Sequence, residues 1–230
     1  MEGKLAAIDL EGYSKQFIQI VQKVIKNPAE FYREMPRSGG FVEPLVFAIC
    51  MGVVAGLVRA VFGILGLEFA ETFFMAIASI VIVPIFVVIF SFIGAGILFL
   101  IWKAMGSQEE YEVSFRCMAY AAAISPITSV LHIIPYLGPI LGLVWMAYLL
   151  VNASVEVHKI ELKKAWIVFG AICAVFAFIS VSSQLAARSV QHNLENMNKQ
   201  LGDINKMSPE EAGQKMGEFL KGLEKGAGKK

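Results

Sequence analysis

The sequence predicts an all-α integral membrane bundle of five transmembrane helices, with an amphipathic N-terminal helix and a helical C-terminal tail. The 230-residue chain is 57% hydrophobic, whereas soluble domains are about 45–50% apolar. Its apolar residues gather into runs of about 18 residues or more, long enough to cross a hydrocarbon core about 30 Å thick. The remaining polar residues lie at the two ends of the chain and in short connections.

The first segment, residues 1–40, is expected to contain the amphipathic helix. Residues 12–26 place apolar side chains on one helical face and lysines elsewhere. The apolar face consists of Tyr13, Phe17, Ile20, Val21, Val24 and Ile25. Such a helix lies on an anionic membrane surface or packs against another part of the same protein, and the sequence leaves both open. The N-terminus has no apolar core of signal-peptide length, so no cleaved signal is expected.

The second segment, residues 41–185, is the predicted five-helix membrane domain. Its spans are expected at about residues 44–67, 73–102, 116–134, 136–155 and 165–185. Gly52 and Gly56 in the first span, and Gly138 and Gly142 in the fourth, are each four residues apart. This small-xxx-small spacing lets helix backbones approach closely, so these glycines are candidate helix-packing residues.

Arg59 lies inside the first apolar run. A charge within a membrane costs a few kcal/mol on insertion scales, and less if the side chain reaches the interface. Arg59 is therefore expected to snorkel or to pair with Glu68 or Glu71. The alternative is that it binds a lipid headgroup or a transported anion.

The third span carries small and polar residues on one helical face, which should turn inward. That face consists of Ala121, Ser125, Thr128, Ser129 and His132. We expect it to pack on the glycine face of the fourth span. His132 is either a hydrogen-bonded structural histidine or a residue linked to proton or ligand binding.

The third segment, residues 186–230, is a predicted soluble helical tail. Its apolar residues step by three and four in a heptad seam formed by Val190, Leu194, Met197, Leu201 and Ile204. A second helix should start at Ser208 and Pro209. The tail could form a homo-oligomer, bind a protein partner or lie along the membrane.

The distribution of positive charge predicts the orientation. Eleven basic residues lie in the N-terminal segment and in the second–third and fourth–fifth connections, and the two opposite connections have none. These residues are Lys4, Lys15, Lys23, Lys26, Arg33, Arg37, Lys103, Arg116, Lys159, Lys163 and Lys164. The positive-inside rule then places the N-terminus in the cytoplasm and, with five spans, the C-terminus outside.

Motifs for catalysis, cofactor binding and metal binding were sought without a match. The sequence has no HExxH, GxSxG, Walker or dinucleotide-binding motif. The histidines are His132, His158 and His192, too dispersed for a shared metal site. A net charge of +1 argues against nucleic-acid binding. We therefore expect no enzyme activity, no cofactor and no metal, and a lipid bilayer as the main partner.

Several residues of the hairpin between the third and fourth spans resemble the Yip-domain family of multispanning membrane proteins. They are Tyr120, Ser125, Pro126, Pro135, Tyr136, Leu137, Gly138, Trp145, Leu149, Leu150 and His158. The preceding stretch NPAEFYREMPRSGG is similar to that of prokaryotic members. The resemblance covers about residues 25–185 and implies five spans, a cytoplasmic N-terminus and a bacterial cytoplasmic membrane. Eukaryotic members are associated with Rab-type GTPases, but their DLYGP motif is absent here.

Two functions are compatible with these features. The favoured hypothesis is a non-enzymatic scaffold or membrane organiser, related to the trafficking role of the family. The alternative is a small transporter or channel that uses Arg59 and the polar face of the third span. No span carries an acidic residue near its middle, which argues against ion-coupled transport.

Overall fold

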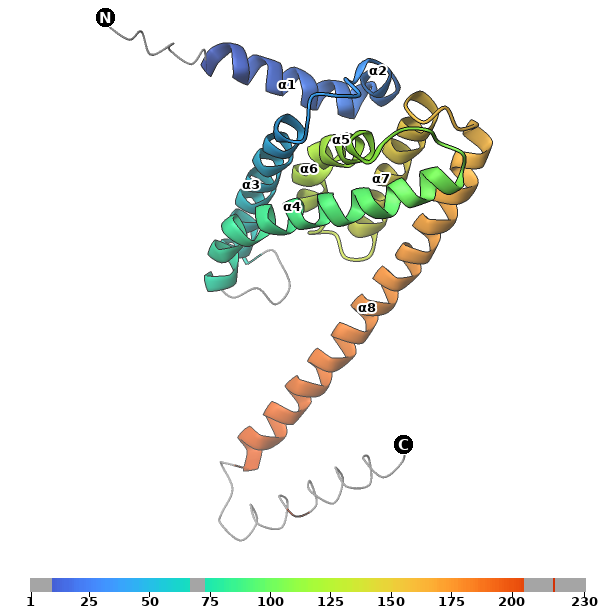
Figure 1. The fold of residues 1–230 in the computed structure, drawn as a ribbon. Helices are drawn as coiled ribbons and strands as arrows, with labels where there is room; N and C mark the ends of the chain where they lie inside the picture. The colour runs from blue at the N-terminus through green and yellow to red at the C-terminus, as the bar shows by residue number, and fades with distance from the viewer. Residues whose placement is uncertain (1–9, 67–72, 205–216, 218–230) are drawn as a thin grey trace, which may run out of the picture. The chain divides into compact units, whose positions relative to one another are not determined.

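A computed structural model describes residues 10–66, 73–204 and 217, and the part of the chain that it describes is all-helical, without strands (Figure 1). The helices are α1 (Leu10–Lys26), α2 (Pro28–Glu34), α3 (Val42–Ile64), α4 (Phe73–Ala104), α5 (Tyr111–Ala121), α6 (Ser125–Leu131), α7 (Leu137–Glu156) and α8 (Leu162–Ile204). A 3-10 turn, Ala122–Ile124, joins α5 to α6. The all-helical fold class is confirmed.

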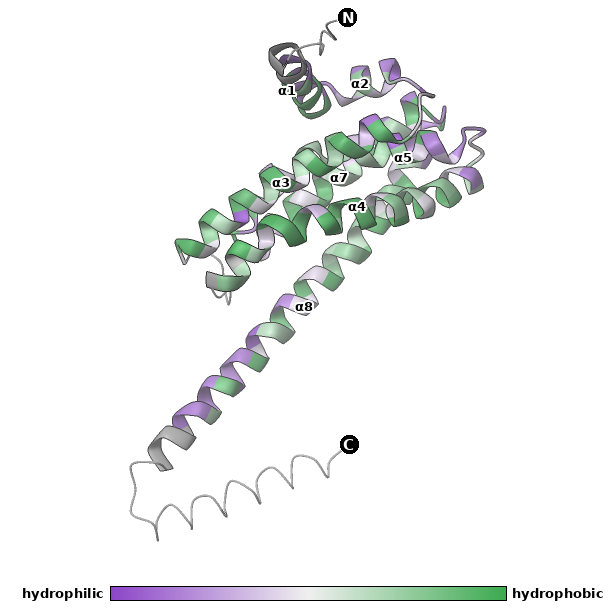
Figure 2. Cartoon of the chain, turned by 60° about the vertical axis from the view of Figure 1, so that its left-hand side comes forward, coloured by the Kyte–Doolittle hydropathy of each residue, from purple (hydrophilic) through white to green (hydrophobic). Residues whose placement is uncertain are grey.

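Four of these helices are long and apolar enough to cross a membrane, namely Val42–Ile64, Ile77–Ala104, Leu137–Glu156 and Leu162–Lys199. Figure 2 shows apolar residues along α3, α4 and α7 and hydrophilic residues around α2 and the start of α5. The second of these candidate spans belongs to α4, which has 32 residues and passes through Pro84 without interruption. A helix of this length measures about 48 Å and exceeds the hydrocarbon core, so tilt must absorb the excess.

The expected third span, at about residues 116–134, is not one continuous helix in the structure. The segment starts earlier, at Tyr111, ends earlier, at Leu131, and is divided by the 3-10 turn. Pro126 explains the division, because proline donates no backbone hydrogen bond and its ring crowds the preceding turn. The helix that contains the expected fifth span, α8, continues past residue 185 to Ile204.

The first helix, α1, packs its apolar face on the rest of the chain. Val24 is fully buried, and Phe17 contacts Phe47 of α3 with ring centroids 5.1 Å apart. The next helix, α2, begins at Pro28 and buries Phe31 and Tyr32. Of the two placements that the sequence left open for this helix, these contacts agree with packing against another part of the same protein.

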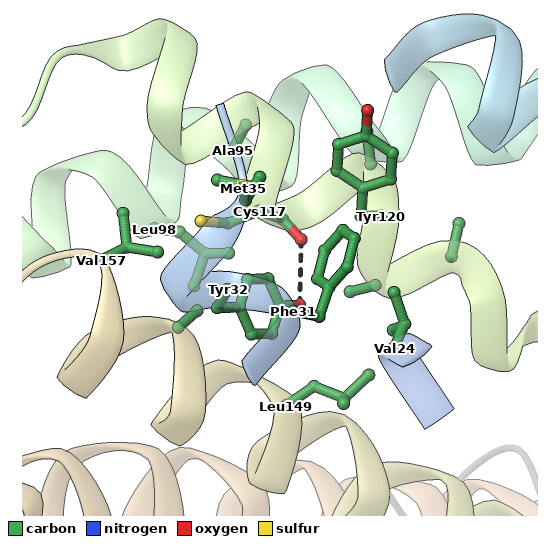
Figure 3. Close-up of a cluster of buried hydrophobic side chains, with 14 of the residues drawn as sticks. Val24, Phe31, Tyr32, Met35, Ala95, Leu98, Cys117, Tyr120, Leu149 and Val157 are labelled. Atoms are coloured by element: carbon green, nitrogen blue, oxygen red, sulfur yellow. Dashed lines mark hydrogen bonds between the residues drawn. The ribbon is translucent and has the colours of Figure 1, made fainter. Parts of the chain in front are cut away.

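The bundle is built on close antiparallel pairs. Helix α3 lies along α4, and α6 turns back onto α7. A cluster of buried side chains from α2, α4, α5 and α7 forms the core at the end of the bundle where α2 docks (Figure 3). This cluster positions the polar groups described below.

The chain divides into two compact units, residues 1–180 and 181–230. In the second unit the structure describes the end of α8, where Val190 and Leu194 are exposed. The predicted helix starting at Ser208 lies outside the described residues.

Candidate functional site

A buried arginine forms the centre of a polar cluster at one end of the bundle. The Arg116 side chain, from α5, is only 1% exposed. Its Nη1 donates to the carbonyl oxygen of Gly40 at 2.8 Å, and Nη2 lies 3.4 Å from a Glu43 carboxylate oxygen. Glu112, one turn earlier on α5, lies 3.7 Å from Nη1. A buried charge is costly unless it is paired and hydrogen-bonded, and these groups supply both.

The loop before α3 is shaped around this guanidinium. Gly39 and Gly40 have φ angles of 121° and 80°, values that favour glycine. A Cβ on Gly39 would sit 3.6 Å from Arg116 Nη1. The Gly40 N–H donates to the Glu112 carboxylate at 2.8 Å. The two glycines therefore let the backbone wrap an arginine that lies 76 residues away in the sequence.

Two further arginines, one in α2 and one just after it, bond to residues at the ends of other helices. Arg33 makes a bidentate pair with Glu156 at the end of α7, with distances of 2.9 and 2.8 Å. This hydrogen-bonded carboxylate raises the pKa of Arg33. Arg37 pairs with Glu109 and donates to the carbonyl oxygen of Val157 at 2.8 Å. The N-terminal segment is thus bonded to both the α4–α5 and α7–α8 connections.

A buried histidine, His158, lies near Arg37. The indole of Trp102 stacks on the imidazole of His158, with ring centroids 3.9 Å apart. The Ser107 hydroxyl lies 2.7 Å from His158 Nδ1, and Trp102 Nε1 donates to Ser154 at 2.8 Å. Burial, with added repulsion from Arg37 and Lys103, lowers the pKa of His158 to about 3. His158 is therefore neutral at physiological pH.

Tyr32 anchors α2 in the apolar core below the cluster. Its ring is fully buried, and its hydroxyl donates to the carbonyl oxygen of Cys117 at 3.3 Å (Figure 3). Burial raises the pKa of Tyr32 well above its usual value. Neighbouring Phe31 meets Tyr120 edge-on, with ring centroids 5.1 Å apart. The α2 helix is therefore held by aromatic packing as well as by ions.

We call the set of Arg33, Arg37, Gly39, Gly40, Glu43, Trp102, Ser107, Glu109, Glu112, Arg116, Ser154, Glu156 and His158 the ionic cap. The Ser107–His158 contact has the atoms of a nucleophile and a base, but both side chains are buried. The other ring nitrogen, Nε2, has no hydrogen-bond partner, so a carboxylate does not orient it as in a catalytic triad. Within the described residues, no three side chains of metal-ligand type are grouped to hold a metal ion. The cap is therefore suited to holding segments together.

The polar membrane residues singled out from the sequence lie in different places. Arg59 and Ser125 line one cavity of about 410 Å³ between α3, α4, α6 and α7. Ser129 is buried in α6, whereas His132 is exposed at its end, with Nδ1 2.7 Å from the Thr128 carbonyl oxygen. The structure thus brings Arg59 and Ser125 together but leaves His132 apart.

The four packing glycines lie where helices come together. A Cβ on Gly52 would sit 2.8 Å from Pro84 Cα, and one on Gly56 would sit 2.6 Å from the Ser79 carbonyl oxygen. A Cβ on Gly138 would overlap the Leu131 carbonyl oxygen. At Gly142 the neighbour is a side chain, the Thr128 methyl group, at 3.1 Å.

Sequence reasoning missed the ionic cap. It counted Arg33, Arg37 and Arg116 only as charges that set orientation. Ser107 and His158, which contact each other, received no role from the sequence beyond the family resemblance of His158. Two features of the sequence pointed to it: the pair Gly39 and Gly40 two residues after Arg37, and an arginine, Arg116, at the start of an apolar run.

Comparison with known families gives one result. A model of the Yip1 domain matches residues 23–183, which include the whole ionic cap. No curated protein and no solved structure matches the chain.

Proposed function

The chain belongs to the Yip1 domain family of membrane proteins, and from this premise we propose that it is a non-enzymatic scaffold that holds α1 and α2 against the cytoplasmic end of its bundle. The observation that carries this proposal is the ionic cap. Arg33 in α2 bonds to Glu156 at the end of α7, and Arg37 after α2 bonds to Val157 and Glu109 in two separate connections. A segment bonded at several points presents one fixed surface to a partner or to the lipid headgroups.

We further propose five spans, with the α5–α6 segment as the third. Residues 111–131 would measure about 30 Å at helical rise, which matches the hydrocarbon core. The cap residues support this count, because they come from the start of α3, the end of α4, the start of α5 and the end of α7. The starts of α3 and α5 and the ends of α4 and α7 lie on one side of the membrane only if each span runs opposite to the span before it.

The proposed topology places residues 1–40 and the ionic cap on the cytoplasmic side, the five spans of residues 41–185 across the membrane and residues 186–230 outside. We propose the cytoplasmic membrane of a bacterium as its location, following the resemblance to prokaryotic members. The seam of Val190, Leu194, Met197, Leu201 and Ile204 would then join copies of the chain, or a protein partner, on the outer side.

Cysteine labelling tests this topology. The native Cys50, Cys117 and Cys173 are first replaced by serine or alanine. Single cysteines then replace Ser38, Gln108 and Ser189 in turn, and intact cells are treated with a membrane-impermeant maleimide. We expect label only at position 189. Label at 108 from outside, or protection of 189 until the cells are opened, would contradict the five-span proposal.

The scaffold role is tested by releasing the segment. Arg33→Ala together with Arg37→Ala should raise hydrogen–deuterium exchange in residues 28–35 and leave exchange in α3 and α7 unchanged. Lys163→Ala, an exposed charge outside the cap, is the matched control. Equal exchange in the double variant and the control would remove the ionic cap as the feature that holds α2.

A further inference from the structure

Two cavities in the membrane domain adjoin each other. The first, of about 280 Å³, lies between α4, α7 and α8. The second, of about 410 Å³, lies between α3, α4, α6 and α7. Both are lined by Met118 and Met146, so these two side chains are the boundary between them.

The cavities lie where α4 and α7 pack less closely on each other than on their other neighbours. Helix α4 packs on α3 and α5, and α7 packs on α2, α5 and α6. The Met118 side chain lies over Gly94, where a Cβ would sit 3.1 Å from the methionine Cε. Methionine is flexible, so this boundary shifts with little cost.

The first cavity is lined only by apolar side chains and glycine. Its walls include Leu98 and Ile101 of α4, Leu150 of α7 and Phe169 and Cys173 of α8. An apolar hollow does not hold water, since water there would lack two to four polar partners. In a bilayer the chemical group that fits such a hollow is a lipid hydrocarbon chain.

The second cavity adds a cationic end to this apolar path. Arg59 lies on its wall five residues before the end of α3, about 8 Å along the helix. At that depth a long arginine side chain reaches the headgroup region. The α4 residues that line the two cavities run from Ile82 to Ile101, about 28 Å at helical rise, so the path is long enough for one extended chain.

We propose that these cavities form one binding groove for an anionic phospholipid. The phosphate of the headgroup lies at Arg59, in the leaflet where α3 ends. One acyl chain passes Met118 and Met146 and enters the cavity between α4, α7 and α8. Neither the scaffold role nor the orientation of the chain is needed for this assignment.

The test uses phosphatidylglycerol with a photoreactive diazirine in one acyl chain, mixed into phosphatidylcholine vesicles that contain the full chain. We expect saturable labelling, with modified peptides that include Met118, Met146 or Cys173. Gly94→Leu fills the groove and should reduce the saturable labelling at least fivefold. Gly170→Leu is the matched control, because a Cβ at Gly170 meets no atom within 4 Å.

A second variant, Met146→Trp, fills the groove from α7 and guards against a folding defect specific to Gly94→Leu. Unchanged labelling in both filled variants, or label spread evenly over the exposed face of α4, overturns the groove. The headgroup assignment is tested separately with the same diazirine chain on phosphatidylcholine. Wild type should favour phosphatidylglycerol, and Arg59→Gln should remove that preference; equal labelling by the two lipids in wild type overturns the role of Arg59.

Discussion

Trp102 stacks on His158 with ring centroids 3.9 Å apart, and the stack joins the end of α4 to the turn that follows α7. The imidazole also meets the Ser107 hydroxyl. One neutral histidine thus holds the end of α4 and the connection that follows it, about 50 residues away in the sequence. This arrangement explains why a residue in a short charged connection is buried.

The stack should make a measurable contribution to stability. His158→Ala removes the aromatic contact and one of the two hydrogen-bond partners of the buried Ser107 hydroxyl, so the free energy of unfolding should fall by about 2–3 kcal/mol. His158→Phe keeps the stack and should lose about half as much. Thermal unfolding in detergent measures both, with exposed His192→Ala as the control. A His158→Ala protein as stable as the control would contradict this role.

The low pKa of His158 predicts a specific pH dependence. Its pKa of about 3 in the folded chain lies below the usual 6.5. Between pH 3 and pH 6.5 the unfolded chain binds a proton at His158 that the folded chain does not bind. The free energy of unfolding therefore rises with pH in this range and decreases as the pH falls below about 6.5. The loss approaches about 1.4 kcal/mol per pH unit at most. Between pH 7.5 and pH 5 the free energy of unfolding should fall more for wild type than for His158→Phe. Equal decreases in the two proteins would mean that His158 is not buried.

Arg116 should be intolerant of conservative replacement. Arg116→Lys keeps the charge but cannot bond Gly40 and the two carboxylates with one planar group. We expect a loss of about 2–4 kcal/mol for both Arg116→Lys and Arg116→Met. Unfolding midpoints of the purified protein measure this, with Lys163→Met as the exposed control. A stable Arg116→Lys variant would show that charge alone suffices.

Close backbone packing predicts an unequal effect of identical glycine substitutions. Gly56→Ala would push a methyl group against the backbone of Ser79, at 2.6 Å, and should destabilise the α3–α4 pair by about 1–3 kcal/mol. Gly170→Ala meets open space and should be neutral or slightly stabilising, because alanine favours helix. Equal unfolding temperatures for the two variants would contradict the close approach of the α3 and α4 backbones at Gly56.

The tail seam makes a separate prediction. Leu194→Lys with Leu201→Lys places charges in the heptad seam and should abolish any chemically cross-linked dimer or higher oligomer. Ser189→Lys with Asn196→Lys adds the same charge on the side of the helix away from the seam and should preserve the oligomer. An oligomer that survives the seam substitutions does not depend on a coiled coil.

The helices were predictable because their apolar runs are long and uninterrupted, as in α3 and α7. The break at Ala122–Ile124 was harder to place from the sequence. Pro126 indicates that one backbone hydrogen bond is missing, but it does not indicate how far the helix is interrupted. The glycine spacing indicated close packing, but it did not identify Pro84 or Ser79 as the neighbours. The ionic cap was missed because Arg33–Glu156 and Arg116–Gly40 are separated by 123 and 76 residues, and local patterns do not report such distant pairs.

The most direct test of the account is a charge exchange between Arg33 and Glu156. Hydrogen–deuterium exchange in residues 28–35 is measured for wild type, Arg33→Glu, Glu156→Arg and the double variant in membranes. Each single variant places like charges together and should increase exchange severalfold, and the double variant should return exchange toward the wild-type value. Single variants without effect, or a double variant as open as the singles, would contradict the claim that the ionic cap holds the N-terminal segment on the bundle.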